Sequence, residues 1–174
     1  MSNVIIRPVA PADIAAITRI YADAVAHGTA SFEIEPPDEA EMARRQQALI
    51  TKRYPYLVAE FAGAVAGYAY AGPYRDRPAY NWCVEDSIYV APEFQRKGIG
   101  RLLLTRLITE SEALGFRQML AVIGDSANTA SVAIHAALGF RLAGTFQSVG
   151  FKRGRWLDTV LMQRALGKGD TSRP

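Results

Sequence analysis

The sequence predicts an α/β fold in which a mixed central β-sheet carries helices on both faces. Three observations support this prediction. Short runs of β-branched and alternating apolar residues recur along the chain, and segments with apolar residues at three- and four-residue spacing lie between them. In the second half the two kinds of segment alternate, which is typical of sheets with parallel strands. Gly115 and Gly139 each end a helical segment, where a left-handed cap is favourable.

The first half contains two helical and three extended segments. Residues 4–9, VIIRPV, are rich in β-branched side chains and predict a strand. Pro11 suits the first turn of the helix that follows, whose apolar stripe consists of Ile14, Ile17, Tyr21 and Val25. We expect a second helix over residues 38–53. Residues 56–72 predict two strands around a turn at Ala62-Gly63, and a loop rich in charges and aromatic side chains follows over residues 73–81.

In the second half we expect strands over residues 82–90 and 118–123, helices over 98–114 and 128–138, and two final strands over 140–149 and 156–163. The 174 residues are 49% hydrophobic and 21% charged, which suits one domain with a single core. We expect that domain to span residues 1–166 and residues 167–174, GKGDTSRP, to form a flexible tail.

The charge and residue counts argue against several classes of protein. The net charge of +3 is mild and the basic residues are scattered, so we expect no nucleic-acid partner. No apolar run approaches the ~20 residues that cross a bilayer, and the N-terminus lacks a signal-peptide pattern. One cysteine and two histidines do not supply a structural zinc site, so we expect no metal. The single Cys83 favours a reducing, cytoplasmic location.

Residues 95–101, QRKGIGR, join a predicted strand to a predicted helix and point to an anion site. The first amides of a helix have no intrahelical partner, and the helix dipole adds positive potential there. Gly98 and Gly100 allow a ligand to approach the backbone closely, while Arg96, Lys97 and Arg101 add charge. Pyrophosphate is the ligand that suits this combination. An ordinary helix cap is the alternative interpretation.

Two known phosphate-binding loops do not fit. A Walker loop needs Lys and Ser or Thr after its last glycine, but Arg101 and Leu102 follow Gly100. A dinucleotide-binding loop needs a third glycine where Leu103 lies. The remaining pattern, Gln/Arg-x-x-Gly-x-Gly, resembles the acyl-CoA loop of the GNAT acetyltransferase superfamily.

The rest of the chain extends this resemblance. The order of elements from residue 4 to residue 164 is similar to the GNAT fold, and NTASVAIHAALGF, residues 128–140, resembles that superfamily's second acyl-CoA helix. The segments SFEIEPP, GPYRDRPAYNWCVEDSIYV and GFKRGRW are similar to the phosphinothricin and methionine sulfoximine N-acetyltransferase subfamily. The resemblance implies acetyl-CoA as acyl donor, a small amino-acid-like acceptor and a homodimer.

The resemblance also implies which residues bind the donor. The backbone of Ile88, Tyr89 and Val90 would bind the acetyl and pantetheine groups like an added strand, and an N–H near Val90 would stabilise the oxyanion. The remaining donor-binding residues that it implies are Gln95, Arg96, Lys97, Gly98, Ile99, Gly100, Arg101, Asn128 and Ser131.

Glu85 is the candidate general base. Together with Ser87 and Tyr89 it lies on one face of a predicted strand, where a carboxylate is costly unless it is paired or functional. A charge facing water on an edge strand is the alternative. The resemblance implies that Glu85 removes a proton from the substrate ammonium group, a task that desolvation would favour by raising its pKa.

His135 is the second candidate catalytic residue. Asn128, Ser131 and His135 share one face of their helix, which could simply face solvent. We expect the opposite face to pack on the core through Ala130, Ile134, Ala137 and Leu138. The resemblance implies that His135 lies near the sulfur of the donor and protonates the departing thiolate.

The charged loop supplies candidate acceptor-binding residues. The planar fork of an arginine suits a carboxylate or phosphinate, although surface arginines are often only solvated. We assign to acceptor binding the residues Phe32, Arg75, Asp76, Arg77, Tyr80, Glu85, Asp86 and Ser87. Trp82 and Trp156 are further candidates for the wall of this pocket, and core packing is the alternative for each aromatic side chain.

We therefore predict an acetyl-CoA-dependent N-acetyltransferase that acts on the α-amino group of a small L-amino acid or analogue by direct attack in a ternary complex. Two other acceptors, protein N-termini and polyamines, stay open, although Arg75 and Arg77 would repel a polyamine. A catalytically silent acyl-CoA-binding module would need the glycine loop but not Glu85. A covalent route through Cys83, with His135 as base, is a further alternative.

Overall fold

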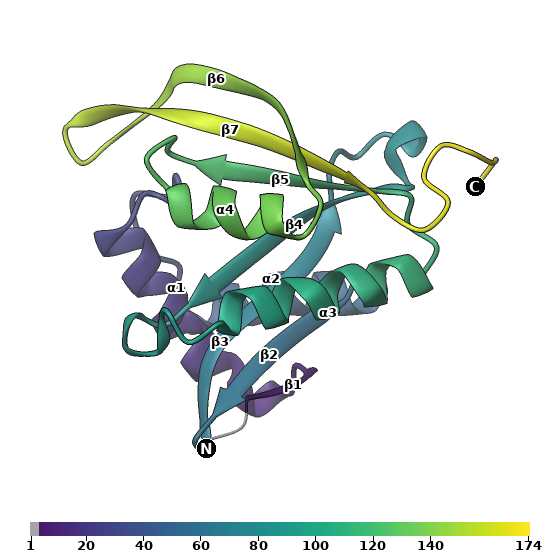
Figure 1. Cartoon of the computed structure of the whole chain (residues 1–174). Helices are drawn as coiled ribbons and strands as arrows, with labels where there is room; N and C mark the ends of the chain where they lie inside the picture. The colour runs from purple at the N-terminus through teal and green to yellow at the C-terminus, as the bar shows by residue number, and fades with distance from the viewer. Residues whose placement is uncertain (1–3) are drawn as a thin grey trace.

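The computed structural model describes residues 4–174 and contains a seven-stranded sheet with the strand order β1-β2-β3-β4-β5-β7-β6 (Figure 1). All neighbouring strands are antiparallel except β4 and β5, which are parallel. The elements in chain order are β1 (Ile5–Pro8), η1 (Pro11–Asp13), α1 (Ile14–His27), α2 (Glu39–Thr51), β2 (Tyr56–Phe61), β3 (Ala64–Pro73), η2 (Pro78–Tyr80), β4 (Cys83–Val90), η3 (Pro92–Phe94), α3 (Ile99–Ala113), β5 (Gln118–Gly124), α4 (Thr129–Ala137), β6 (Arg141–Lys152) and β7 (Arg155–Ala165).

The predicted α/β class and every predicted helix and strand are confirmed. The three short 3-10 helices η1, η2 and η3 were not predicted; each begins at a proline, whose fixed φ suits a first helical turn. The strands β6 and β7 extend further than predicted. They stay paired up to a tight turn in which Arg153 and Gly154 both have positive φ, the backbone that a two-residue hairpin turn requires.

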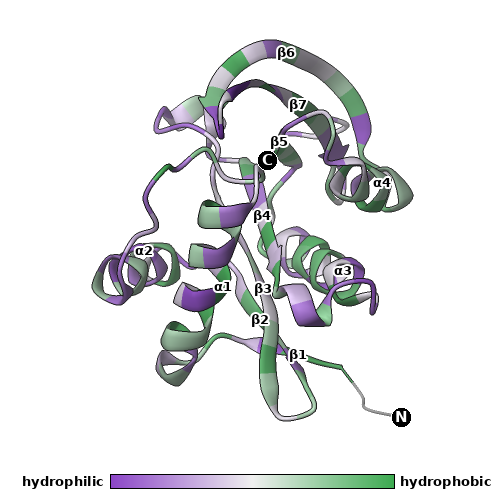
Figure 2. Ribbon diagram, turned by 90° about the vertical axis from the view of Figure 1, so that its left-hand side faces the viewer, coloured by the Kyte–Doolittle hydropathy of each residue, from purple (hydrophilic) through white to green (hydrophobic). Residues whose placement is uncertain are grey.

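Helices cover both faces of the sheet, α1 and α2 on one side and α3 and α4 on the other (Figure 2). Alternation along β3 divides its side chains between two cores. Ala69 and Ala71 belong to the core under α3, whereas Tyr68 belongs to the core under α1. The two faces of β4, which pairs with β3, therefore lie toward different helices, one toward α1 and α2 and the other toward α3 and α4.

The sheet opens between β4 and β5. Within the described part of the chain, the two strands pair only over Cys83–Asp86 and Gln118–Ala121. After Asp86, β4 stays paired with β3 and β5 stays paired with β7, so the two parallel strands diverge toward their C-terminal ends (Figure 1). Clefts at the C-terminal ends of parallel strands are the usual ligand sites of α/β folds.

The C-terminal residues pack against the end of α3 and the start of β5. The guanidinium group of Arg117 donates hydrogen bonds to the carbonyl oxygens of Gly169 and Arg173 and to Ser172 Oγ. The flexibility expected for residues 167–174 stays a prediction. Among residues 4–174, no helix has the length and apolar character to cross a membrane.

Candidate active site

The opening between β4 and β5 leads into a cleft of about 660 Å³. All the predicted donor-binding residues except Lys97 line it, and His135, Asp86 and Ser87 line it as well. Lys97 instead donates a hydrogen bond to the carbonyl oxygen of Glu93, 3.2 Å away. The structure therefore brings together residues from β4, from the glycine loop and from α4, while their roles toward a ligand stay predictions.

The glycine loop presents the free end of α3 to this cleft. Gly98 is the N-cap residue, with a left-handed φ of +79°, and no side chain of the described residues caps the first turn. The first amides of the helix are thus available to an anion. A Cβ atom at Gly100 would make only ordinary contacts, 3.5 Å from Ile134 and 3.8 Å from Val90, so packing within the protein does not demand glycine there. Close approach of a ligand would explain it.

Glu85 lies on the face of β4 toward α1 and α2, where it is half-buried. Burial, reinforced by the charge of Asp86 and opposed by that of Arg75, raises the pKa of Glu85 to about 7. A carboxylate with this pKa can accept a proton at neutral pH and release it again.

Tyr70 belongs to the same face and was missed by the sequence analysis. It pairs with Ser87 across β3 and β4, and the pKa of its phenol is raised by burial, partly offset by a hydrogen bond with Ser87. The segment GYAYAG contained the signal, because its strict alternation puts Tyr68 and Tyr70 on one face of a strand. Their position across from Ser87 depends on the pairing of β3 with β4, which the sequence did not specify.

Asp86 lies on the other face of β4, toward α4, and not beside the predicted acceptor-binding residues. Its Oδ2 atom is 3.0 Å from Nε2 of His135, and both residues are buried. The prediction for the faces of α4 was confirmed for Ile134 and Leu138, which pack on the core, and was wrong for Ala130 and Ala137. His135 is the buried residue of this helix, whereas Ala130 and Ala137 are exposed, because the hydrogen bond to Asp86 satisfies the ring inside the protein.

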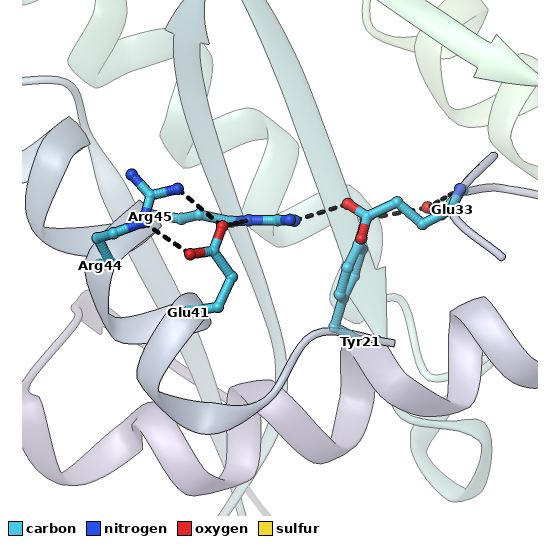
Figure 3. Close-up of polar contacts among 6 residues, drawn as sticks. Tyr21, Glu33, Glu41, Arg44 and Arg45 are labelled. Carbon is cyan, nitrogen blue, oxygen red and sulfur yellow. Dashed lines mark hydrogen bonds and ion pairs between the residues drawn. The ribbon is translucent and has the colours of Figure 1, made fainter. Parts of the chain in front are cut away.

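A network of hydrogen bonds fixes the segment between α1 and α2 (Figure 3). Glu33 accepts hydrogen bonds from the Tyr21 hydroxyl, at 2.9 Å, and from Arg45 Nη1, at 2.6 Å. Arg45 also donates to Glu41, which accepts two further bonds from Arg44. Sequence reasoning missed this network, since its members come from two helices and a loop. It holds the loop that carries Phe32.

The ring of Phe32 packs against the backbone of two glycines. A Cβ atom at Gly150 would lie 2.3 Å from this ring, so Phe32 would have to move. A Cβ atom at Gly124 would lie 2.9 Å from the ring and 2.5 Å from the Thr29 carbonyl oxygen, so this position needs glycine. Lys152 ends β6 as a buried residue and donates a hydrogen bond to the Ser31 carbonyl oxygen at 2.7 Å. The loop before α2 is thereby attached to the β6–β7 hairpin and to the end of β5.

The charged loop approaches the Glu85 face through Arg75. Arg75 stacks over the ring of Tyr74, 5.1 Å from its centroid, and is close enough to Glu85 for its charge to lower the pKa of that carboxyl. Tyr80 packs edge-on against Tyr74. The charge of Asp76, in contrast, acts on Tyr54, whose pKa is raised mainly by burial.

Two further residues predicted to bind the acceptor, Arg77 and Trp156, make no contact within residues 4–174 that would place them on the Glu85 face of β4. Arg77 is exposed at the start of η2, and Trp156 packs on Phe151 at the exposed hairpin. Trp82 is exposed next to β4.

Cys83 does not have the surroundings of a nucleophile. Burial, together with the charge of Glu85, raises the pKa of its thiol to about 11, so the thiolate is scarce at neutral pH. His135 lies on the opposite face of β4 beside Asp86 and cannot serve as its base. This geometry favours direct transfer over an acyl-cysteine route. Nowhere in residues 4–174 do three or more His, Cys, Asp or Glu side chains gather in the arrangement of a metal site.

Comparisons with known proteins agree with the geometry. Residues 16–140 match the model of the Acetyltransferase (GNAT) family. The chain is 53% identical to a phosphinothricin N-acetyltransferase of Alcaligenes faecalis, over 97% of this chain and 86% of that protein. It is 43% identical to an L-methionine sulfoximine/L-methionine sulfone acetyltransferase of Salmonella typhimurium, over 89% and 90% of the two chains.

A crystal structure of a phosphinothricin acetyltransferase from Sinorhizobium meliloti in complex with acetyl-CoA superposes with a TM-score of 0.96 at 50% identity, covering 98% of this chain and 92% of that one. The resemblance predicted from the glycine loop and the flanking motifs is thereby confirmed. The chain belongs to the GNAT family of acetyltransferases.

Proposed function

We propose that this protein is an acetyl-CoA-dependent N-acetyltransferase of the α-amino group of a small L-amino acid or analogue. The observation that carries the proposal is the divergence of β4 from β5, which leaves unpaired strand backbone beside the free end of α3, with the carboxylate of Glu85 on the opposite face of the same strand. The names of the relatives support the acceptor class, with methionine sulfoximine, methionine sulfone and phosphinothricin as the first compounds to test.

The cleft suits acetyl-CoA, which when bound supplies an activated thioester. The first amides of α3, with Arg96 and Arg101, would hold its diphosphate. Backbone groups of residues 88–90, on the side of β4 that β5 leaves free, would bind the pantetheine like an added strand. Asn128 and Ser131 lie further along the same cleft and would orient it.

The acceptor would bind on the opposite face of β4. Glu85 would take a proton from its ammonium group, which frees the nitrogen lone pair for attack on the thioester. An N–H group near Val90 would stabilise the oxyanion that forms. Arg75 offers a guanidinium group to the acceptor's carboxylate, and Phe32 and Tyr80 an apolar wall. Holding both reactants in one opening supplies proximity and orientation.

The test is a panel of amines assayed with acetyl-CoA by release of the free thiol. The panel contains the three named analogues, free L-amino acids, peptides with free N-termini and polyamines. We expect acetylation of amino-acid-like compounds and none of polyamines. Exclusive acetylation of peptides or polyamines would contradict the proposed acceptor class, and binding of acetyl-CoA without turnover of any amine would favour a silent acyl-CoA-binding module.

We further propose a cytoplasmic homodimer built from a single domain, residues 1–166, with a flexible tail over residues 167–174. Five large apolar side chains on the β6–β7 hairpin support the dimer, because each is 55% to 64% exposed. They are Leu142, Phe146, Val149, Phe151 and Trp156. The free thiol of Cys83 supports a reducing location.

A further inference from the structure

Lys152 is a buried charge that the proposed reaction does not use. It ends β6 and is 6% exposed, although lysine is seldom buried without a charged partner. Its Nζ atom donates a hydrogen bond to the Ser31 carbonyl oxygen, 2.7 Å away. Burial, together with the charge of Arg153, lowers the pKa of Lys152, and the charge of Glu33 partly offsets this effect. Glu33 forms its ion pair with Arg45 instead.

The hydrogen bond is what a lysine supplies at this position. A methionine side chain has a similar length and would fill the same space without burying a charge, which is costly. An ammonium group, in contrast, forms a charge-assisted hydrogen bond, which is stronger than a bond between neutral groups. Because Lys152 and Ser31 are both buried, water does not compete for this bond. The ammonium group therefore fixes the Ser31 carbonyl to the β6–β7 hairpin.

Further hydrogen bonds hold both neighbours of Phe32. The Tyr21 hydroxyl lies 2.9 Å from Ser31 Oγ and donates its hydrogen to Glu33, also at 2.9 Å (Figure 3). Since this hydroxyl has one hydrogen, Ser31 Oγ is the donor in the first contact. Arg45 Nη1 donates to Glu33 from α2. The backbone on either side of Phe32 is thus attached to α1, to α2 and to the hairpin, which fixes the direction of its ring.

The ring of Phe32 is wedged between two strands. A Cβ atom at Gly150 on β6 would lie 2.3 Å from Cε2 of the ring, and a Cβ atom at Gly124, at the end of β5, would lie 2.9 Å from Cε1 on its other edge. Gly150 and Lys152 are two positions apart on β6 and point to the same face, toward this loop. Gly150 gives the ring its space, and Lys152 holds the backbone that carries the ring.

The loop borders the face of β4 that we assign to the acceptor. Tyr70 lies on this face, and the charges of Glu85 and Glu33 both reach its phenol. Phe32 is adjacent to Glu33 in the chain and is 37% exposed, so part of its ring is free to contact a ligand. The position of this ring therefore affects how much room an acceptor has beside Glu85.

We propose that Lys152 is a positioning residue of the acceptor site: it holds residues 31–33 against the β6–β7 hairpin, so that Phe32 stays over Gly150 and limits the size of the acceptor side chain. The inference rests on the proposed function. Without the bond from Lys152, the ring would be free to move away from the hairpin and the acceptor site would widen. Lys152 acts through Phe32 and does not itself touch the acceptor.

The donor cleft should keep its shape when this bond is lost. The loop reaches that cleft at Ala30. The preceding residue, Thr29, has a separate anchor, since its hydroxyl donates to Asp125 after β5, 3.1 Å away. Loss of the Lys152 ammonium group should thus affect the acceptor and not the donor, which distinguishes positioning of Phe32 from a general loss of stability.

The first test follows the loop directly and needs no acceptor. In Lys152→Met, amide hydrogen exchange of residues 29–34 should become at least about tenfold faster, because the loop opens more easily without this charge-assisted bond. Exchange at the start of α3 should not change. Lys52→Met, which replaces an exposed lysine at the end of α2, is the matched control and should leave both segments unchanged. Unchanged exchange of residues 29–34 in Lys152→Met would overturn the proposal.

The second test measures acceptor selectivity. For Lys152→Met, the ratio of kcat/KM for L-phenylalanine to kcat/KM for methionine sulfoximine should rise about tenfold, since a wider site admits the bulkier ring and loses contacts with the slimmer compound. KM for acetyl-CoA should change less than about twofold. Gly150→Ala should change the selectivity ratio at least about fivefold, because its Cβ atom displaces the Phe32 ring while Lys152 stays in place. Gly144→Ala, on the same strand with no atom within 4 Å of its Cβ, should not change it.

A lysine that only stabilises the hairpin predicts a different result. Lys152→Met would then unfold at lower temperature and keep the selectivity of the unmodified protein, and this outcome contradicts the proposal. Unchanged selectivity in Gly150→Ala would show that the Phe32 ring does not limit acceptor size, and this too contradicts the proposal.

A variant that does not fold leaves a measurement on the unmodified protein. Ammonium hydrogens in a buried hydrogen bond exchange slowly, whereas those of a solvated lysine exchange rapidly, so ¹⁵N NMR of the lysine side chains tests the bond to Ser31. A rapidly exchanging Lys152 would reject the proposal. The two ideas also fail separately: an amine panel without turnover rejects the proposed function, while normal turnover with unchanged loop exchange and selectivity rejects only the role of Lys152.

Discussion

At the scale of single residues, the surroundings of Glu85 suit it to the proton transfer that we propose for it. An exposed glutamate is almost entirely ionised at neutral pH and is a weak base. Half-buried beside Asp86, with Arg75 as the opposing charge, the carboxyl has a pKa of about 7. The base is then strong enough to accept a proton and is still largely available in its ionised form.

Replacement of Glu85 by glutamine should lower kcat by about 100-fold or more, because the variant cannot take up the proton of the ammonium group. Affinity for acetyl-CoA should not change, since the proposed donor cleft lies on the other side of β4. In the unmodified enzyme kcat/KM should rise with pH through about 7, and the variant should lose this rise. Steady-state kinetics across the neutral pH range and calorimetric titration with acetyl-CoA measure both effects.

Glu60→Gln is a matched control, because Glu60 is also a half-buried strand carboxylate but pairs with Arg7 on β1, away from the cleft. It should leave kcat unchanged. Equal activity of Glu85→Gln and the unmodified enzyme would favour the silent acyl-CoA-binding module instead.

Some residues of the site could be predicted from the sequence and others could not. Glu85 could be predicted, because a charged side chain in a strand of alternating apolar residues is costly unless it is paired or functional. The Asp86–His135 pair was not, since its partners are 49 positions apart and meet only when α4 packs across the opening. The same absence of tertiary information led to the wrong placement of Ala130, Ala137 and His135 on α4, because alanine is by composition a more usual core residue than histidine.

At the scale of elements, the start of α3 can be tested with a pair of glycines. Gly98 and Gly63 both have φ +79° and have open space where a Cβ atom would lie, so replacing either by alanine should cost a similar ~1 kcal/mol of stability. Of these two glycines, Gly98 lies beside the cleft and Gly63 does not.

We expect Gly98→Ala to raise KM for acetyl-CoA about tenfold, because the added Cβ atom would occupy space through which the anion approaches the first amides of α3, and the loss of one such contact is worth roughly that factor. Gly63→Ala, in the turn between β2 and β3, should leave KM unchanged. Thermal unfolding and steady-state kinetics of both variants separate the two effects. An equal change in KM would show that backbone strain alone, and not donor binding, governs the result.

The junction of β1 and α1 depends on one ion pair. Arg7 donates two hydrogen bonds to Asp13, at 2.7 and 2.8 Å, and Asp13 also accepts one from the Ala10 amide. The bond from Arg7 outweighs burial and lowers the pKa of Asp13. A lowered carboxyl pKa gives stability that is complete above the unfolded-state value of about 4 and is lost as pH falls through the folded-state value.

Asp13→Asn should therefore lower the free energy of unfolding by about 1–3 kcal/mol at pH 7. The difference from the unmodified protein should shrink as pH falls below about 4 and should vanish below the lowered folded-state pKa of Asp13, where the carboxyl is protonated in both states. Urea unfolding at several pH values measures it. A difference that stays the same from neutral to strongly acidic pH would mean that the charge of Asp13 is not the source of the stability.

Most elements followed from the sequence, since periods of two and of three to four residues distinguished strands from helices along the whole chain. The exceptions have physical causes. The sequence predicted that β6 ends and β7 begins further from the turn than they do. The glycines and charged residues near the turn interrupt the apolar alternation, although backbone hydrogen bonds still pair the two strands there. The divergence of β4 from β5, which creates the cleft, does not change the periodicity of apolar residues and so could not be predicted from the sequence.

At the scale of the whole molecule, the exposed hairpin predicts the assembly state. Replacing Phe146 and Val149 together by lysine should convert the proposed dimer into a monomer, because two charges would be buried at the interface. Light scattering after size-exclusion chromatography measures the mass. Ile5→Lys, on β1 at the opposite edge of the sheet, is similarly exposed and should leave the mass unchanged. A monomeric unmodified protein would reject the dimer.

The short contact between β4 and β5 has a mechanical consequence. Four residues of each strand connect a half of the molecule built on β1–β4 to a half built on β5–β7, so these halves have few backbone bonds in common. A ligand bound in the cleft between β4 and β5 would contact both halves and make them unfold as one cooperative unit. Coenzyme A with or without its acetyl group should then raise the melting temperature and slow amide exchange in both halves at once.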